Sequence, residues 1–444
     1  MMLRKFLVSG MIMALLLTAA GCGGSGSKPA DNAGSNTAPK TEAPKADPAQ
    51  PVTGKLVIYI KTGPEANGMR EVAEAYTAKT GIKVEILEQG AANYFPTLIT
   101  QLASGTDAFD LVGTNTAFAG PMAGAGNLVP LNARMASSTT GKFDDIQLKY
   151  PYQGETYVIP FDVSAHLLFY RSDLIPNPPQ TWDEYMEVAK QFTKSITPNS
   201  PTQFGMAWTA RSGPEQPKAF YDFMWSYGGY IVNDKNEVGV NTDGAVKAAE
   251  FWANAAKTKV IPPDMPNWSY GNVLDAMKTG VIAMAGPMWS PAYKDILNSD
   301  SPHKNNWKVT LIPGVKQADG KVYRTPFQHS WALGINKSSK NVEAAWKFLE
   351  YATGPEGIAV YSAKWGTSVR KAVLNDPNSK PRDYYDLILQ TLTLSKAEPL
   401  VPYYLTMHDA MNEALSGVLT GTKQPKPAMD EAANKIKELI KNTK

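Results

Sequence analysis

From residue 55 onward, short apolar runs alternate with stretches whose apolar residues recur at helical spacing. The run 55–60 predicts a buried strand, and the pattern over 65–79 predicts a helix that ends at Gly81. The same patterns predict strands over 82–87 and 109–113 and a helix over 94–102. Strands that alternate with helices indicate a parallel, doubly wound sheet.

A second set of signals lies between residues 157 and 189. The apolar, aromatic-rich run Leu167–Tyr170 is typical of a strand that is buried on both faces, which favours a sheet covered by helices. Thr181 and Glu184 fit the S/T-x-x-E capping box, so a helix is predicted to begin at Trp182. Because proline is poorly tolerated inside a central strand, we interpret Pro160 as a hinge between two units.

The second half of the chain repeats the alternation of strand and helix patterns. Apolar periodicity predicts helices over 243–257, 273–278, 341–351 and 427–441, and β-prone runs occupy 204–208, 309–314 and 330–336. In the last helix Met429, Ala433, Ile436 and Ile440 form one apolar stripe. We therefore expect a second α/β unit.

Composition sets the class of protein. The 444 residues are 43% hydrophobic and 19% charged, which is enough for two or three domains with real cores. The formal net charge is only +3, and the Lys and Arg residues are scattered along the chain. This pattern argues against nucleic acid as a partner.

The N-terminus has the pattern of an exported lipoprotein. Basic residues precede an apolar run over 6–20 that is too short for a comfortable membrane span, and small residues stand immediately before Cys22. Cys22 is the only cysteine, so an internal disulfide is impossible and lipidation explains the residue. We expect a signal peptide over 1–21 and, over 22–53, a flexible linker rich in Gly, Ser, Pro and Ala.

Several segments resemble the extracellular solute-binding proteins (family 1) of ABC importers, in particular the maltose and maltodextrin branch. Residues 159–185, IPFDVSAHLLFYRSDLIPNPPQTWDEY, are similar to the hinge-strand-helix unit of that branch, and residues 54–86 are similar to its opening. Residues 277–287 resemble its helix-Gly-strand unit that ends in Gly-Pro-Trp, although the tryptophan here falls one residue later, at Trp289.

The resemblance implies an α/β, two-lobed periplasmic binding protein-like fold of type II, with discontinuous lobes and three hinge crossings. The expected first lobe comprises residues 54–162 and 316–352, and the expected second lobe comprises 163–314 and 354–444. It also implies a lipid-anchored, extracytoplasmic protein that captures a sugar between its lobes and delivers it to the permease subunits of an ABC transporter. We expect a monomer.

No catalytic or cofactor motif is found. His166, His303, His329 and His408 are dispersed, and one cysteine cannot form a thiolate metal site. The S-x-x-K match at Ser301 lacks its companion motifs, and there is no P-loop or G-x-G-x-x-G segment. We therefore expect a binding protein without a metal or cofactor.

Aromatic residues stand at predicted strand and loop ends, where α/β folds bind ligands. A sugar ring presents an apolar face that packs on an aromatic ring and hydroxyls that pair with carboxylates, amides and Arg. A tryptophan can equally be a core residue, but the neighbouring Pro287 and Gly366 favour the ligand site for Trp289 and Trp365. The candidate ligand-binding residues are Glu65, Asn115, Asp162, Trp208, Trp268, Trp289, Gln328, His329, Trp331, Trp365, Arg370 and Tyr403.

The candidate site departs from the maltodextrin branch. Gly63 and Pro64 replace an acid and a lysine, Ser164 replaces the hinge glutamate, and His408 stands at the late tryptophan. The fold therefore transfers better than the maltose contacts, and we expect another sugar. An extracytoplasmic carbohydrate-active enzyme, which needs two suitably spaced carboxylates, and a binder of a non-sugar solute stay open as alternatives.

Overall fold

The computed structural model describes residues 54–90, 93–233, 235–378 and 382–443. The predicted signal peptide, Cys22 and the predicted linker lie outside these residues. The strands are β1 (Leu56–Lys61), β2 (Val84–Gln89), β3 (Leu111–Asn115), β4 (Val158–Arg171), β5 (Phe204–Ala207), β6 (Ile282–Trp289), β7 (Trp307–Thr310), β8 (Val315–Lys316), β9 (Val322–Tyr323) and β10 (Gln328–Ile335).

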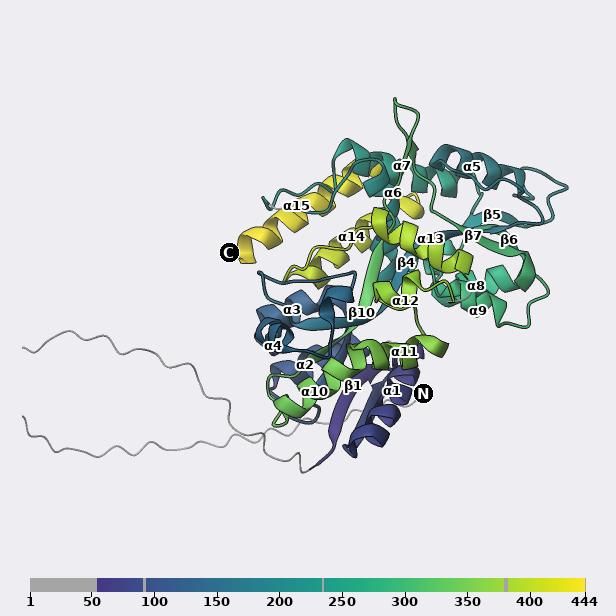
Figure 1. Cartoon of the computed structure of the whole chain (residues 1–444). Helices are drawn as coiled ribbons and strands as arrows, with labels where there is room; N and C mark the ends of the chain where they lie inside the picture. The colour runs from purple at the N-terminus through teal and green to yellow at the C-terminus, as the bar shows by residue number, and fades with distance from the viewer. Residues whose placement is uncertain (1–53, 91–92, 234, 379–381, 444) are drawn as a thin grey trace, which may run out of the picture. The chain divides into compact units, whose positions relative to one another are not determined.

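Helices separate most of these strands (Figure 1). The α-helices are α1 (Pro64–Thr80), α2 (Tyr94–Ala103), α3 (Ala119–Gly124), α4 (Asn132–Ser137), α5 (Trp182–Gln191), α6 (Glu215–Ser226), α7 (Asp243–Lys257), α8 (Tyr270–Thr279), α9 (Ala292–Leu297), α10 (Val342–Thr353), α11 (Pro355–Lys364), α12 (Lys371–Asn375), α13 (Arg382–Leu394), α14 (Tyr404–Leu419) and α15 (Pro425–Thr443). Short 3-10 helices include η1 (Thr116–Phe118) and η3 (Met265–Asn267).

The main sheet has the strand order β2-β1-β3-β10-β4-β6-β5, with β7 also paired to β4. β1 is parallel to β2 and β3, and β5 is parallel to β6, as the alternation of strands and helices predicts. β10, however, runs antiparallel to both β3 and β4, and β4 is antiparallel to β6 and β7. The sheet is therefore mixed, because a strand from late in the chain enters between two early ones.

β4 joins two groups of strands. Its first half pairs with β10, which is followed in the sheet by β3, β1 and β2. We call these four strands and the first half of β4 the first strand group. Its second half pairs with β6 and β7, and with β5 these form the second strand group. Pro160 pairs with Ala332, whereas Asp162 pairs with Trp331. Residues two apart on β4 thus face neighbouring residues on β10, so the register of the pairing shifts at this point. Such an irregularity is one of the few places where a sheet accepts proline.

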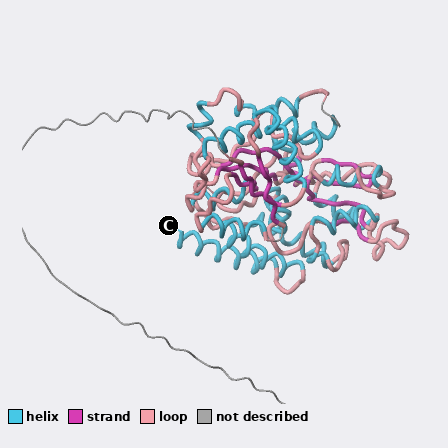
Figure 2. The backbone as a smooth tube through the Cα atoms, turned by 90° about the horizontal axis from the view of Figure 1, so that it is seen from below, coloured by secondary structure: helices cyan, strands magenta, loops and turns pink. Residues whose placement is uncertain are grey.

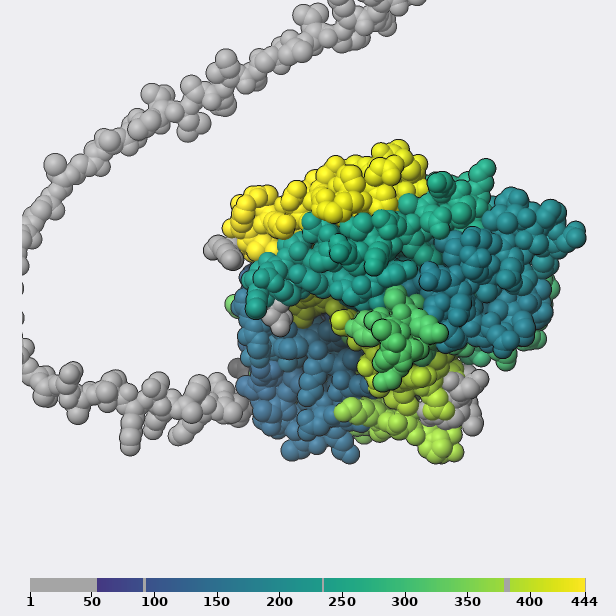
Figure 3. Space-filling model, turned by 90° about the horizontal axis from the view of Figure 1, so that it is seen from above, coloured from purple at the N-terminus to yellow at the C-terminus, as the bar shows by residue number. Residues whose placement is uncertain are grey.

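The helices lie on both sides of the strands (Figure 2). α1 and α10 pack on the first strand group and α11 packs on α1, whereas α5 and α8 pack on the second group. α15 lies along α14 and α7 and appears in yellow across the teal segment in Figure 3. The chain passes between the two strand groups within β4, before β10 and after α11, where Val163 N–H donates to the Thr367 carbonyl at 3.1 Å.

Several local predictions are confirmed. α5 begins at Trp182, and both hydrogen bonds of the Thr181–Glu184 capping box are present. α1 ends at Gly81, whose φ of 75° is left-handed and suits a residue without a Cβ. The predicted apolar stripe of α15 is buried. Within the described part of the chain, none of the helices has the length and apolar character needed to cross a membrane.

Candidate functional site

Trp289, at the end of β6, lies among polar and aromatic side chains. Its indole Nε1 donates a hydrogen bond to Glu215 Oε2 at 2.5 Å. The His329 imidazole stacks on the indole with ring centroids 4.3 Å apart and 25° between the ring planes. The His166 ring meets the indole edge-on at 4.1 Å. Trp289 is only 7% exposed, so its surroundings rather than solvent determine which part of the ring is accessible.

Glu215 and Lys218 form an ion pair beside this indole. Glu215 is the first residue of α6, and its Oε1 accepts a hydrogen bond from Lys218 Nζ at 3.0 Å. Lys218 is almost fully buried, and its Nζ lies 5.8 Å from the Trp289 ring centroid. Burial opposes ionisation of the carboxyl, but the Lys218 charge and the hydrogen bonds from Lys218 and Trp289 outweigh it and lower the pKa of Glu215 to about 2. The carboxylate is therefore charged at pH 7.

His329 lies on β10, where the chain returns to the first strand group. Burial, reinforced by the Lys218 charge, holds the pKa of His329 well below its usual range, so the imidazole is neutral at pH 7. Its Nδ1 is buried without a hydrogen-bonding partner among the described residues. A polar atom in this position costs free energy unless something pairs with it. His329 is therefore suited to contact a ligand hydroxyl.

Gln328 precedes His329 and lies against the first strand group. Its Oε1 accepts a hydrogen bond from the Tyr150 hydroxyl at 2.6 Å, and the same hydroxyl lies 3.0 Å from Ser330 Oγ. Gln328, His329 and Tyr150 line a cavity of about 10 Å³ together with residues of η1 and Glu398. This is room for about one water molecule, so a larger ligand requires the two sides of the cavity to separate.

A buried carboxylate, Glu398, stands on the far side of that cavity. It accepts a hydrogen bond from the Tyr404 hydroxyl at 3.1 Å and is also bonded to His408 Nε2. His408 Nδ1 has no hydrogen-bonding partner in the described structure. The Tyr404 ring in turn meets Phe118 of η1 edge-on at 5.1 Å. This group therefore joins the start of α14 to the first strand group.

A second set of predicted residues gathers near the first crossing. Lys61 Nζ lies 3.3 Å from Glu65 Oε2 and 5.1 Å from the centroid of the Trp331 ring. Asp162 Oδ1 accepts a hydrogen bond from Thr367 N–H at 2.8 Å. Burial raises the pKa of Asp162 to about 7, and the negative charge of Glu65 adds to the rise. Asp162 therefore ties the first crossing to the third.

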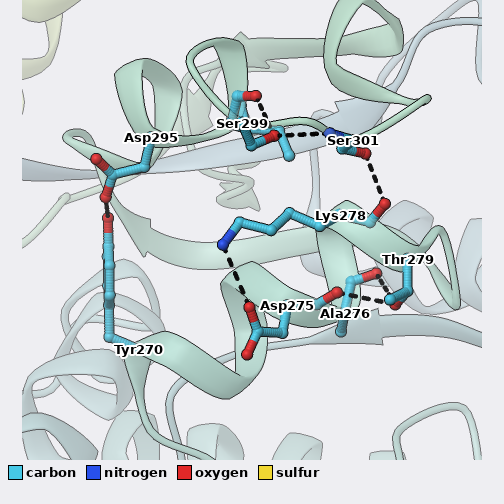
Figure 4. Close-up of polar contacts among 9 residues, drawn as sticks. Tyr270, Asp275, Ala276, Lys278, Thr279, Asp295, Ser299 and Ser301 are labelled. Carbon is cyan, nitrogen blue, oxygen red and sulfur yellow. Dashed lines mark hydrogen bonds and ion pairs between the residues drawn. The ribbon is translucent and has the colours of Figure 1, made fainter.

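Tyr270 and Asp295 approach this set from the second strand group. The Tyr270 hydroxyl donates to Asp295 Oδ2 at 2.6 Å, and Figure 4 shows the two side chains joining the start of α8 to α9. Burial, followed by the charge of Asp295, raises the pKa of Tyr270, and Glu65 contributes as well.

Two other predicted contacts have local structural partners. Asn115 Oδ1 accepts a hydrogen bond from Ala117 N–H and caps η1, and Asn115 pairs with Trp331 in the sheet. Arg370 is 1% exposed and donates to the carbonyls of Gly141, Lys142 and Thr353. The guanidinium thus links two backbone segments, and the structure does not bring Arg370 to Trp289 or His329.

The remaining tryptophans fall in different surroundings. Trp208 is fully buried in the core beside Phe223 and Trp252, away from the polar set around Trp289. Trp268 directly follows η3 and is partly buried. Trp365 ends α11 and its Nε1 donates to Glu71 at 3.0 Å.

Tyr403 precedes α14, next to the Tyr404–Glu398 group, and its buried hydroxyl has no partner in the described structure.

Three site residues are missed by the sequence analysis: Glu215, Lys218 and Glu398. Glu215 had a usable signal, because an acidic residue in the first turn of a helix that follows a strand lies at the ligand-binding edge of an α/β sheet. Glu398 had none, since it stands in an irregular segment between α13 and α14. No group of three or more His, Cys, Asp and Glu residues in the described ranges could hold a metal ion.

The arrangement combines aromatic rings with charged hydrogen-bonding groups that are already paired with one another. Such groups bind uncharged polar molecules through charge-assisted hydrogen bonds without needing a counter-charge from the ligand. The carboxylates near the rings have structural partners: Glu215 has Lys218 and Trp289, and Asp162 has the Thr367 backbone. The chemistry that this site supports is recognition of a polar ligand with apolar faces.

Comparison with known proteins gives consistent matches. Residues 62–359 match the family model described as bacterial extracellular solute-binding protein. A maltotriose-binding protein of Pyrococcus abyssi is 26% identical, with 88% of this chain and 83% of the relative covered. A galactooligosaccharide-binding protein of Bacillus subtilis is 23% identical over 87% and 90%. The solved structure of maltose-bound MalE3 of T. maritima has a TM-score of 0.75 and 23% identity, covering 87% of this chain and all of the other.

Proposed function

Because the chain belongs to the bacterial extracellular solute-binding proteins, which serve ABC transporters outside the cytoplasm, we propose that its solute is a neutral sugar or oligosaccharide. The observation that carries the proposal is the cluster of Trp289, His329, Glu215 and Lys218. It offers aromatic surface next to charged groups that are already paired. Relatives named for binding maltotriose and galactooligosaccharide support the same class of ligand.

The expected affinity follows from the size of the aromatic contact. One sugar face on an indole removes on the order of 50–100 Å² of apolar surface from water, worth roughly 1–2.5 kcal/mol. A micromolar binder needs about 8 kcal/mol in all. Aromatic contacts at Trp289 and Trp331, with hydrogen bonds to Glu65, Gln328, His329 and Tyr403, reach that range. Trp208 is left out of this proposal because it is buried against Phe223 and Trp252, and Arg370 because it is buried and bonded to backbone carbonyls.

We further propose that binding closes two lobes around the sugar. The β8–β9 hairpin follows Gly314, which bridges to Thr181 beside α5, so we assign the hairpin to the second lobe. α11 packs on α1, so residues 355–364 join the first lobe. These assignments shift the boundaries predicted from the sequence at 316 and 352. Small-angle scattering with and without the true ligand checks closure, since the radius of gyration should fall.

The N-terminal segment suggests how the protein is held at the membrane. We propose that Cys22 carries a diacylglyceryl anchor and that a monomer works with the permease from there, because more than one acyl chain is needed for stable attachment. Cys22→Ser should move the protein from the membrane fraction to the soluble fraction. Unchanged fractionation would refute lipidation.

A ligand screen tests the proposed function. Maltose, maltotriose, galactooligosaccharides and simple polyols are added to the purified protein, with amino acids and polyamines as non-sugar controls. A saturable rise in melting temperature with a sugar, without turnover of that sugar, is the expected result. A response to the non-sugar solutes alone would overturn the assignment of a sugar, and release of shorter sugars would favour the enzyme alternative.

A further inference from the structure

Glu215 uses both carboxylate oxygens before any ligand arrives. Oε2 accepts the indole N–H of Trp289 at 2.5 Å, and Oε1 accepts from Lys218 Nζ at 3.0 Å. A hydrogen bond to an ionised acceptor is shorter and about twice as strong as a neutral one. The ion pair therefore gives the indole a strong and directional partner.

The position of Glu215 is itself fixed by the fold. The Gln216 amide donates to the Ala210 carbonyl at 2.6 Å, which holds the first turn of α6 to the end of the preceding segment. Gly213 N–H donates to Asn412 Oδ1 at 3.1 Å, which ties the segment just before this turn to α14. Glu215 thus extends from a fixed helix start toward the end of β6.

Trp289 needs such a restraint because its ring orientation is not set by the strand. The torsion that turns an indole about its Cβ–Cγ bond has broad minima. His166 limits one edge of the ring, and His166 is held by Asp222 at 2.6 Å. The N–H end of the indole is restrained by Glu215, which decides how the ring plane is presented next to His329.

We propose that Glu215 is a positioning residue that acts on ligand affinity through Trp289, and that Lys218 holds the Glu215 carboxylate for this task. The inference rests on the proposed function, since it concerns how the aromatic surface for a sugar is oriented. The negative acceptor also polarises the indole N–H and makes the ring face more electron-rich, which favours contact with the electropositive C–H face of a sugar.

Two double variants isolate the hydrogen bond from the charge. Glu215→Gln/Lys218→Met and Glu215→Leu/Lys218→Met both lack the ion pair and have similar volumes. Only the glutamine variant can accept a hydrogen bond from the indole N–H. We expect the glutamine variant to bind the sugar found in the screen about three- to tenfold more tightly than the leucine variant, with similar melting temperatures. Equal affinities would overturn the proposal.

A second comparison asks whether the effect passes through Trp289. In a Trp289→Phe background the ring has no N–H, so the two double variants should differ less than twofold in affinity. A difference that persists in this background would mean that residue 215 contacts the ligand or acts through the fold. That outcome would also overturn the proposal.

A measurement without ligand separates this inference from the proposed function. The indole N–H resonance of Trp289, assigned by its loss in Trp289→Phe, should move upfield in the leucine variant relative to the glutamine variant. If the screen finds no sugar and the resonance still moves, the proposed function fails while the contact stands. If the resonance is the same in both variants, Glu215 does not position the indole, whatever the ligand is.

Discussion

Trp208 and Trp289 stand at the carboxyl ends of two neighbouring parallel strands, β5 and β6, yet they occupy different environments. Trp208 is fully buried between Phe223 and Trp252, and its Nε1 has no partner in the described structure. Trp289 is bonded to Glu215 and stacked on His329. A position at a strand end therefore does not determine the environment of a tryptophan, because the neighbouring side chains differ.

The largest expected effect is a loss of stability when Trp208 is replaced. Trp208→Ala should lower the free energy of unfolding by about 3–5 kcal/mol, because it leaves a large cavity in a closed aromatic core. Sugar affinity, measured on the folded fraction, should change little. Denaturant titration gives the first quantity and calorimetry the second. Trp208→Phe is the matched control and should cost much less, since it keeps a ring and removes a buried N–H that has no partner. A loss below about 1 kcal/mol in Trp208→Ala would contradict the core assignment.

The next effect is on affinity at Trp289. Trp289→Ala should weaken sugar binding by about five- to seventyfold, because it removes an aromatic contact worth roughly 1–2.5 kcal/mol. It should cost less stability than Trp208→Ala, since part of its surroundings is polar and can be hydrated. Calorimetry and thermal melting on the same variant measure both. A large fall in melting temperature with unaltered affinity would instead place Trp289 with the core and direct the search to Trp268 or Trp365.

These two residues show where sequence analysis stops. The start of α5 was predictable because Thr181 and Glu184 act within one turn. The end of α1 was predictable because glycine adopts the left-handed φ of Gly81 without a Cβ clash. Local chemistry determines such features. The difference between Trp208 and Trp289 depends on α6, whose Phe223 faces one and whose Glu215 faces the other. No pattern along the chain assigns those two contacts.

The sheet shows the same limit at a larger scale. Alternating strands and helices predict parallel pairing, which holds for β1 with β3 and for β5 with β6. β10 enters between β3 and β4 in the antiparallel sense after more than 150 residues of intervening chain. Only the family resemblance indicated that the chain recrosses. The lobe boundaries and ligand contacts stay predictions until a ligand is identified.

A pH titration extends the comparison to Asp162 at the crossings. The pKa of Asp162 is raised to about 7, mainly by burial, whereas an unfolded Asp titrates near 3.9. Its contribution to stability is therefore full below about pH 4 and is lost as the pH rises to about 7. Asp162→Asn does not titrate, so its free energy of unfolding relative to wild type should rise by about 3–4 kcal/mol between pH 4 and pH 8.

Asp173 serves as the control for that titration. Its hydrogen bonds to Arg171 lower its pKa, so its contribution is present above the unfolded pKa and is lost as the pH falls. Asp173→Asn should therefore lose stability relative to wild type as the pH rises, opposite in sign to Asp162→Asn. Parallel pH profiles for the two variants would show that Asp162 does not titrate near neutrality in the folded protein.

The smallest effect on sugar affinity is expected for Trp365→Phe, which makes the same substitution as Trp289→Phe at another position. Trp365→Phe removes an N–H that donates to Glu71 at 3.0 Å, and this bond is the first cause of the lowered pKa of Glu71. The pKa of Glu71 should therefore rise toward its usual value, which an NMR titration of the carboxyl carbons measures. Sugar affinity should change less than twofold, whereas Trp289→Phe should weaken it at least threefold, because only the Trp289 indole lies beside His329 and Lys218. If Trp365→Phe weakened binding tenfold while Trp289→Phe left it unchanged, the aromatic surface for the ligand would lie between α11 and α1, and the contrast between Trp289 and Trp208 would lose its functional meaning.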